Sequence, residues 1–252
     1  MPVTNAPFSE ANNVKMNESD VIALIELSDE INSLFGGKFA FSLGYNCGYY
    51  DSTNSGDKAF LKYSYKFQWF NHLPRHEHVV EYGLSSDEIE ELLIIGNKFE
   101  KEHGLTDYVA HYLVTPKHEG LWPPYEPLYA NFEKFNIFYT STPYLEKPAT
   151  YGKVKIMKRQ KNDLASYDCS YQQESREKIA QLVEISYNII MNNAASILVT
   201  HQANYAKDRI ANELLSNLID RLIAQHDYNI VFLPAEKVIE LYHEIYYSSS
   251  RP

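Results

Sequence analysis

The sequence is poor in cysteine, in basic residues and in long apolar runs, and each shortage excludes a class of protein. Two cysteines, Cys47 and Cys169, are too few for a disulfide framework or a zinc knuckle, and they leave the redox compartment open. Acidic residues outnumber basic ones by 33 to 23, so we expect no nucleic-acid partner. No apolar run reaches the roughly 18 residues of a membrane helix, so we expect no membrane span.

The N-terminus also lacks the features of an export signal. Residues 1–16 contain neither a basic segment nor an apolar core, and we expect them to be irregular. Cytoplasmic localisation is the default expectation, and export stays open if the natural N-terminus lies further upstream. No Pro, Gly or Ser tract is long enough to act as a linker, so the sequence predicts a single domain over residues 1–252.

Segments with helical periodicity alternate with strand-like apolar segments from about Ser19 onward. Ser85 and Glu88 have the spacing of a capping box, and Gly104 stands where that helix is expected to end. The alternation predicts an α/β fold with a largely parallel sheet, covered on both faces or closed into a barrel. The predicted helices are 19–34, 85–104, 126–135, 174–192, 207–226 and 235–247. The predicted strands are 38–46, 63–70, 107–116, 136–142, 153–161, 195–201 and 228–233, and 51–58 is predicted to be a loop.

In such folds the chemistry gathers where strands end, and one predicted strand end is followed by two histidines. His72 and His76 have H-x-x-x-H spacing, which can direct both imidazoles to one point, and neutral imidazole is a common zinc ligand. Pro74 disfavours a regular helix, but a tight turn brings the rings together equally well. The spacing alone also fits surface or packing histidines, and we expect His78 to lie outside the ligand set.

Two further strand ends carry residues that could do chemistry. A Pro-rich segment contains His118 and Trp122, which fit either a sugar-facing loop or a rigid loop packed by aromatic rings. A later apolar strand leads to His201, which fits either a general acid or a buried structural histidine. The segment Lys153–Lys161 is locally basic, which fits an exposed strand face or a track for an acidic polymer.

Three segments in order along the chain carry a family resemblance. Residues 67–77 (FQWFNHLPRHE), 101–151 and 197–209 (ILVTHQANYAKDR) resemble the deacetylase domain of heparan sulfate N-deacetylase/N-sulfotransferases. That domain is related to the NodB-like polysaccharide deacetylases of carbohydrate esterase family 4. The resemblance runs from about Lys15 to near the C-terminus. It implies a distorted (β/α) barrel and metal-dependent hydrolysis of the acetamide of N-acetylglucosamine units in a polysaccharide.

The resemblance also implies roles for individual residues. The T-H-x-x-N-Y segment of the family is matched from Thr200 onward, and its H-S-G-V-Y-P loop is matched by HEGLWP from His118. A divalent metal is implied, with zinc as the first candidate. The implied metal ligands are His72 and His76, the general acid is His201, and the glycan-binding residues are His118, Trp122, Asn204 and Tyr205.

One departure from the family concerns its aspartate pair, which supplies a base and a metal ligand. The pair belongs on a strand before the helix at 19–34, but residues 1–16 contain no Asp, so the barrel is expected to lack its first strand. Three explanations stay open. Either the chain is truncated, or a local acid replaces the pair, or the protein is an inactive relative that acts as a carbohydrate-binding module. Among the local acids, Asp57 is favoured over Asp51 as the base. A zinc peptidase is disfavoured because H-E-x-x-H is absent.

Overall fold

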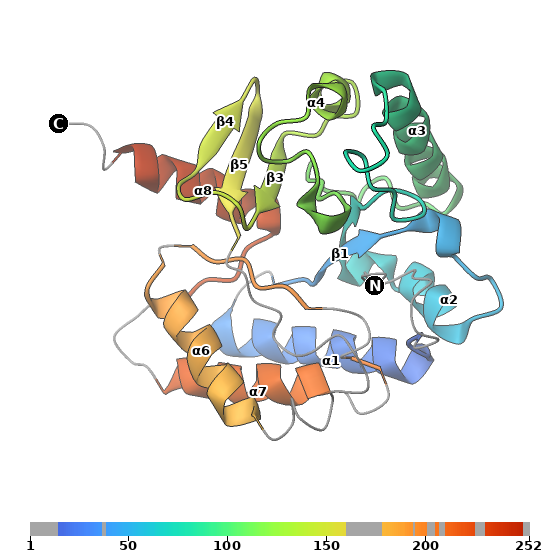
Figure 1. The fold of residues 1–252 in the computed structure, drawn as a ribbon. Helices are drawn as coiled ribbons and strands as arrows, with labels where there is room; N and C mark the ends of the chain where they lie inside the picture. The colour runs from blue at the N-terminus through green and yellow to red at the C-terminus, as the bar shows by residue number, and fades with distance from the viewer. Residues whose placement is uncertain are drawn as a thin grey trace.

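Short strands and longer helices are mixed along the chain, and the strands that the structure describes form two sheets (Figure 1). The computed structural model describes residues 15–36, 39–159, 178–193, 195–200, 205–206, 210–224 and 230–248. Its helices are α1 (Glu18–Phe35), α2 (Ser55–Lys62), α3 (Ser86–Glu102), α4 (Glu126–Phe132), α6 (Ile179–Met191), α7 (Ile210–Ile223) and α8 (Ala235–Ser248). Its strands are β1 (Ser42–Tyr45), β2 (Gln68–Asn71), β3 (Tyr139–Thr142), β4 (Ala149–Tyr151) and β5 (Val154–Lys158).

Each sheet contains one parallel pair of strands. Strand β1 pairs with β2 in parallel, with Ser42 opposite Gln68, and β3 pairs with β5 in parallel, while β4 joins β5 antiparallel as a hairpin. The predicted mixed α/β class is therefore confirmed. The two sheets do not close into a barrel within the described ranges, so the distorted barrel and its missing first strand stay predictions.

Local signals define the two best-formed helices. The Asn17 side chain caps α1 and Asp20 reaches back to the Asn17 N–H, while Gly36 ends the helix at φ 60°. The predicted capping box of α3 is confirmed, because Ser85 and Glu88 bind each other's backbone N–H. Among the helices that the structure describes, none combines the length and the apolar character that a membrane crossing needs.

Four predicted segments differ from the structure. The predicted strand at 107–116 forms isolated bridges only, from Val109 to Trp69 and from Tyr112 to Tyr139. Residues 51–58 are not all loop, because Asn54 accepts a hydrogen bond from the Asp57 N–H and so starts α2. In the described part of the predicted strands at 195–201 and 228–233, no strand is present. Val199 makes an isolated bridge, and apolar residues such as Leu198 and Phe232 pack against the core, since burial and ladder pairing are separate requirements.

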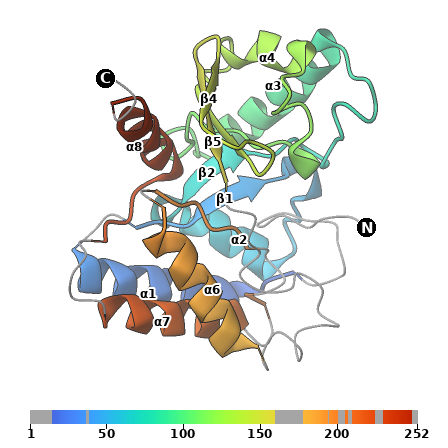
Figure 2. The ribbon, with the colours of Figure 1, turned by 60° about the vertical axis from the view of Figure 1, so that its left-hand side comes forward.

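Two hydrophobic clusters lie on opposite sides of the β1–β2 pair. The helical core includes Val21, Phe60 and Trp69 and is covered by α1, α6 and α7, which lie together in Figures 1 and 2. The sheet core includes Leu73 and Ile156 and is built from α3, α4, α8 and β3–β5. The chain passes from one core to the other between Trp69 and Leu73. The end of β2 therefore lies at the boundary of the two cores.

Candidate functional site

The end of β2 is fixed by backbone and side-chain hydrogen bonds from β1. The backbone N–H of His72 donates to the Tyr45 carbonyl at 3.1 Å. The buried Asn46 side chain, directly after β1, donates to the carbonyls of His72 at 2.8 Å and Leu73 at 2.6 Å. Because a buried carbonyl without a partner is costly, these bonds stabilise the chain where it leaves the sheet.

A tight turn then carries the chain from His72 to His76. Leu73 and His76 both have left-handed backbones, with φ of 64° and 63°. The N–H of Gly48 donates to the Pro74 carbonyl at 2.8 Å, and a Cβ at Gly48 would lie 2.8 Å from that oxygen, so only glycine permits this approach. The turn brings the rings of His72 and His76 to 5.2 Å between centroids, as their spacing predicts.

The buried ring of His72 is held in one tautomer. Its Nδ1 lies 2.5 Å from the Val114 carbonyl oxygen, which can only accept, so Nδ1 carries the proton and Nε2 carries the lone pair. Burial, followed by the neighbouring His76, holds the pKa of His72 well below its usual range, so the ring is neutral. A neutral imidazole whose second nitrogen donates to a carbonyl is the usual state of a metal-ligating histidine, and His72 therefore fits that role.

The loop that carries His118 lies close to this pair. His118 ends the short 3-10 helix η4 (Pro116–His118) with φ 61°, and Lys117 before it has φ 50°. Arg159, directly after β5, contacts the Nε2 atom of His118 with its Nη2, and the Nδ1 of the same ring is 3.3 Å away. Trp122 is partly buried and packs against the sheet core. The positive charge of Arg159 also contributes to lowering the pKa of His72.

The predicted base, Asp57, lies in the first turn of α2 and is buried. Its carboxylate accepts hydrogen bonds from the Lys15 ammonium at 3.0 Å and from the Asp51 N–H at 2.9 Å. Burial raises the pKa of Asp57, and these two donors act against the rise. These contacts are those of a structural ion pair between the start of α1 and α2, and a catalytic role for Asp57 stays a prediction.

The third predicted segment is only partly described. His201 and Asn204 lie outside the described residues. Tyr205 is described and buried in the helical core, where its ring meets Phe41 edge to face at 5.7 Å, and burial raises its pKa. The roles of these three residues stay predictions.

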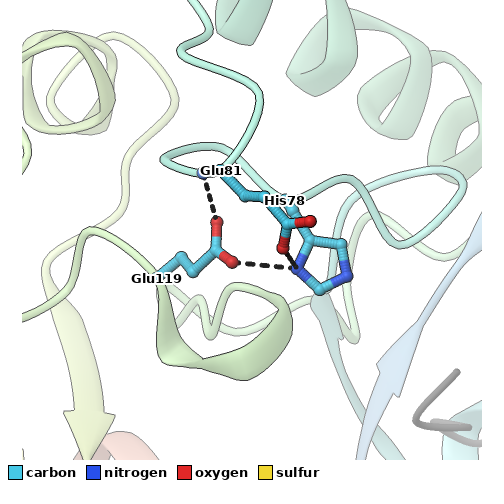
Figure 3. A group of neighbouring side chains, drawn as sticks. All are labelled: His78, Glu81 and Glu119. Atoms are coloured by element: carbon cyan, nitrogen blue, oxygen red, sulfur yellow. Dashed lines mark hydrogen bonds and ion pairs between the residues drawn. The ribbon is translucent and has the colours of Figure 1, made fainter. Parts of the chain in front are cut away.

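One group of polar residues was missed by sequence reasoning. His78, Glu81 and Glu119 lie together beside the histidine pair, and the rings of His76 and His78 are 5.4 Å apart (Figure 3). Sequence spacing gave a weak signal for His78 and Glu81, which are three residues apart. It gave none for Glu119, which comes from a different loop, or for Arg159.

Comparisons with known proteins agree with the resemblance seen in the sequence. The profile of the heparan sulfate-N-deacetylase deacetylase domain matches residues 5–170, well over half of the chain, and the chain belongs to this family. The Caenorhabditis elegans bifunctional heparan sulfate N-deacetylase/N-sulfotransferase 1 is 30% identical over 84% of this chain and 26% of its own length. The Homo sapiens bifunctional heparan sulfate N-deacetylase/N-sulfotransferase 3 is 27% identical over 94% of this chain and 29% of its own length. The chain thus spans less than a third of these relatives.

Proposed function

We propose that this chain is a zinc-dependent N-deacetylase that hydrolyses the acetamide of N-acetylglucosamine units in a polysaccharide, as in heparan sulfate N-deacetylation. The observation that carries the proposal is the neutral, buried ring of His72, which is held by the Val114 carbonyl and lies against His76. Membership of the deacetylase-domain family supports it.

His72 and His76 would hold the metal, and zinc is favoured because neutral imidazole is among its preferred ligands. When bound, zinc supplies polarisation of the acetamide carbonyl and a lowered pKa of the attacking water. The proton of that water passes to a carboxylate, for which Asp57 is the sequence-based candidate. His201 protonates the departing amine as the C–N bond breaks, and acetate and a free glucosamine amine result.

Glycan binding is assigned to the loop after η4 and to the predicted segment at 200–205. The partly exposed ring of Trp122 offers an apolar face for a pyranose, and His118 offers a hydrogen-bonding nitrogen held in place by Arg159. Asn204 and Tyr205 complete the proposed set.

A second candidate is a carbohydrate-binding protein without catalysis. It is favoured by the contacts of Asp57, whose carboxylate is bound by Lys15. In addition, no group of three ligand atoms within 4.8 Å that includes both His72 and His76 occurs in the described part of the chain. Two histidines without a carboxylate would bind zinc weakly and would not activate water.

Acetate release from N-acetylglucosamine oligomers and from N-acetylated heparan precursor separates the two candidates. The enzyme is expected to release acetate in the presence of zinc, and the double variant His72→Ala/His76→Ala is expected to release none. Glycan binding without acetate release by the folded, zinc-supplied chain would overturn the enzymatic proposal and support the second candidate.

A further inference from the structure

A second set of ligand atoms lies outside the His72–His76 pair. One ligand atom from each of His78, Glu81 and Glu119 lies within 4.8 Å of the others, and no other group of three His, Cys, Asp or Glu residues does so in the described ranges. The Nδ1 of His78 is 2.9 Å from Oε1 of Glu119 and 3.8 Å from Oε2 of Glu81. Figure 3 shows both carboxylates directed at this one nitrogen.

Glu119 is oriented by the backbone of the opposite turn. Its Oε2 accepts hydrogen bonds from the N–H of Val80 at 3.0 Å and of Glu81 at 3.1 Å, which leaves Oε1 directed at His78. Burial opposes ionisation, but these bonds and His78 together lower the pKa of Glu119, so it is a carboxylate at neutral pH. Outer hydrogen bonds that fix the direction of a carboxylate are a usual feature of metal sites.

Glu81 is placed by the turn that follows His78. The N–H of Tyr82 donates to the His78 carbonyl at 3.0 Å and that of Gly83 to the Val80 carbonyl at 3.0 Å. This turn presents Glu81 on the same side as the ring of His78. The Glu81 side chain is 55% exposed, so a solvated ion has direct access to the group.

The charges of the group are unbalanced. The Nδ1 of His78 can share only one proton, so it cannot neutralise two carboxylates. Lys117 provides the remaining counter-charge, with its Nζ 2.9 Å from Oε2 of Glu81. The Lys117 side chain is 48% exposed and makes a surface ion pair, which is weak and readily exchanged for another cation.

We propose that His78, Glu81 and Glu119 form a second metal site, which binds a divalent transition ion by displacing Lys117 from Glu81. One imidazole and two carboxylates suit zinc or manganese, whereas calcium and magnesium prefer oxygen ligands alone. The ion ties the turn at 78–83 to the loop after η4. It thereby stabilises the two loops that carry His76 and His118, and it needs no acetyl substrate and no catalysis.

Zinc binding by the whole chain tests this site, with competition against a chromophoric chelator as the readout. Two equivalents are expected for the parent chain, and Glu81→Gln and Glu119→Gln are each expected to weaken one equivalent at least about tenfold. Glu90→Gln is the matched control, because Glu90 also pairs with a lysine, Lys134, on the surface. This control is expected to bind zinc as the parent does, and excess calcium is expected not to compete.

The same titration separates this proposal from the proposed enzyme site. If only the second site exists, the parent binds one equivalent that depends on Glu81 and survives in His72→Ala/His76→Ala. If that folded double variant binds no zinc, or if Glu81→Gln and Glu119→Gln bind zinc with unchanged number and affinity, the second site is refuted. A zinc-dependent rise in the melting temperature of His72→Ala/His76→Ala that the addition of Glu81→Gln abolishes gives an independent readout of the same site.

Discussion

The two histidine groups after β2 differ in the partner that fixes each imidazole. His72 is buried, and its Nδ1 donates to the Val114 carbonyl, so its Nε2 carries the lone pair. His78 is partly exposed, and its Nδ1 faces the carboxylate of Glu119, with which it belongs to the metal site that we propose. We therefore expect His72 to act through its other ring nitrogen, and His78 to act together with the carboxylates that it contacts.

Their positions in the fold reinforce this difference. His72 lies at the boundary of the helical core and the sheet core, where strands β1 and β2 and the Asn46 side chain hold the backbone. His78 lies in a turn held by its own backbone bonds and by one loop 41 residues away. We call His72 and His76 the inner group, and His78, Glu81 and Glu119 the outer group. Changes at the inner group should therefore affect activity most, and changes at the outer group should affect cation affinity and loop stability.

The largest effect is expected for His72→Ala. Residues that only orient a metal ligand contribute roughly 10- to 100-fold to affinity or activity, so removal of a ligand is expected to lower acetate release by at least about a hundredfold. Activity assayed at saturating zinc, with circular dichroism as a check of folding, measures this effect. If Glu81→Gln lowers activity as much as His72→Ala does, the two groups do not differ in their contribution to activity.

The variant Asp57→Asn tests whether a carboxylate from α2 acts at the site of His72 and His76. The substitution replaces the charged Oδ2, which accepts from both Lys15 and the Asp51 N–H, by a neutral amide, so the free energy of unfolding is expected to fall by about 1–3 kcal/mol. Urea denaturation measures this change, and Asp51→Asn, at a partly exposed loop position, is the matched control.

The activity of the same Asp57→Asn variant decides between the two roles of this residue. General base catalysis typically contributes about 10²- to 10⁴-fold. A loss of that size in a variant that remains folded would establish Asp57 as the base. A loss confined to stability would show that its pairing with Lys15 is structural.

Arg159→Ala tests the connection between the inner group and the loop after η4. Without the Arg159 contact the ring of His118 is no longer held, and we expect kcat/KM to fall about tenfold while zinc binding stays as in the parent. Lys158→Ala is the neighbouring control. Steady-state kinetics on oligomers of increasing length measures the effect, and a loss of zinc together with activity would contradict a role in substrate positioning.

Much of the helical framework could be predicted from the sequence because its signals are local. The capping box of Ser85 and Glu88 and the periodicity of α1 depend on residues three or four positions apart. The run at 228–233 was predicted as a strand from its apolar content alone. Its described part has no sheet partner. Strand pairing depends on contacts between segments that are distant in the sequence, as between β1 and β2, and apolar content does not report these contacts.

The candidate site likewise has features that the local sequence predicts and features that only the folded chain brings together. The approach of His72 and His76 follows from their spacing and from Pro74, which excludes a regular helix. The bonds of Glu119 to His78 and of Arg159 to His118 each join segments 41 residues apart, and only the folded chain brings them together.

The smallest effect is expected for Lys117→Gln at the outer group. Lys117 neutralises Glu81 in the absence of a metal, so a divalent ion must displace it. Exposed ion pairs contribute roughly 0.2–1 kcal/mol, and removal of this competitor is therefore expected to tighten zinc binding by roughly 1.4- to fivefold. Lys134→Gln, at a surface ion pair distant in the sequence, is expected to leave zinc affinity unchanged. Weaker zinc binding in Lys117→Gln would mean that the lysine holds Glu81 in place for the ion and does not compete with it.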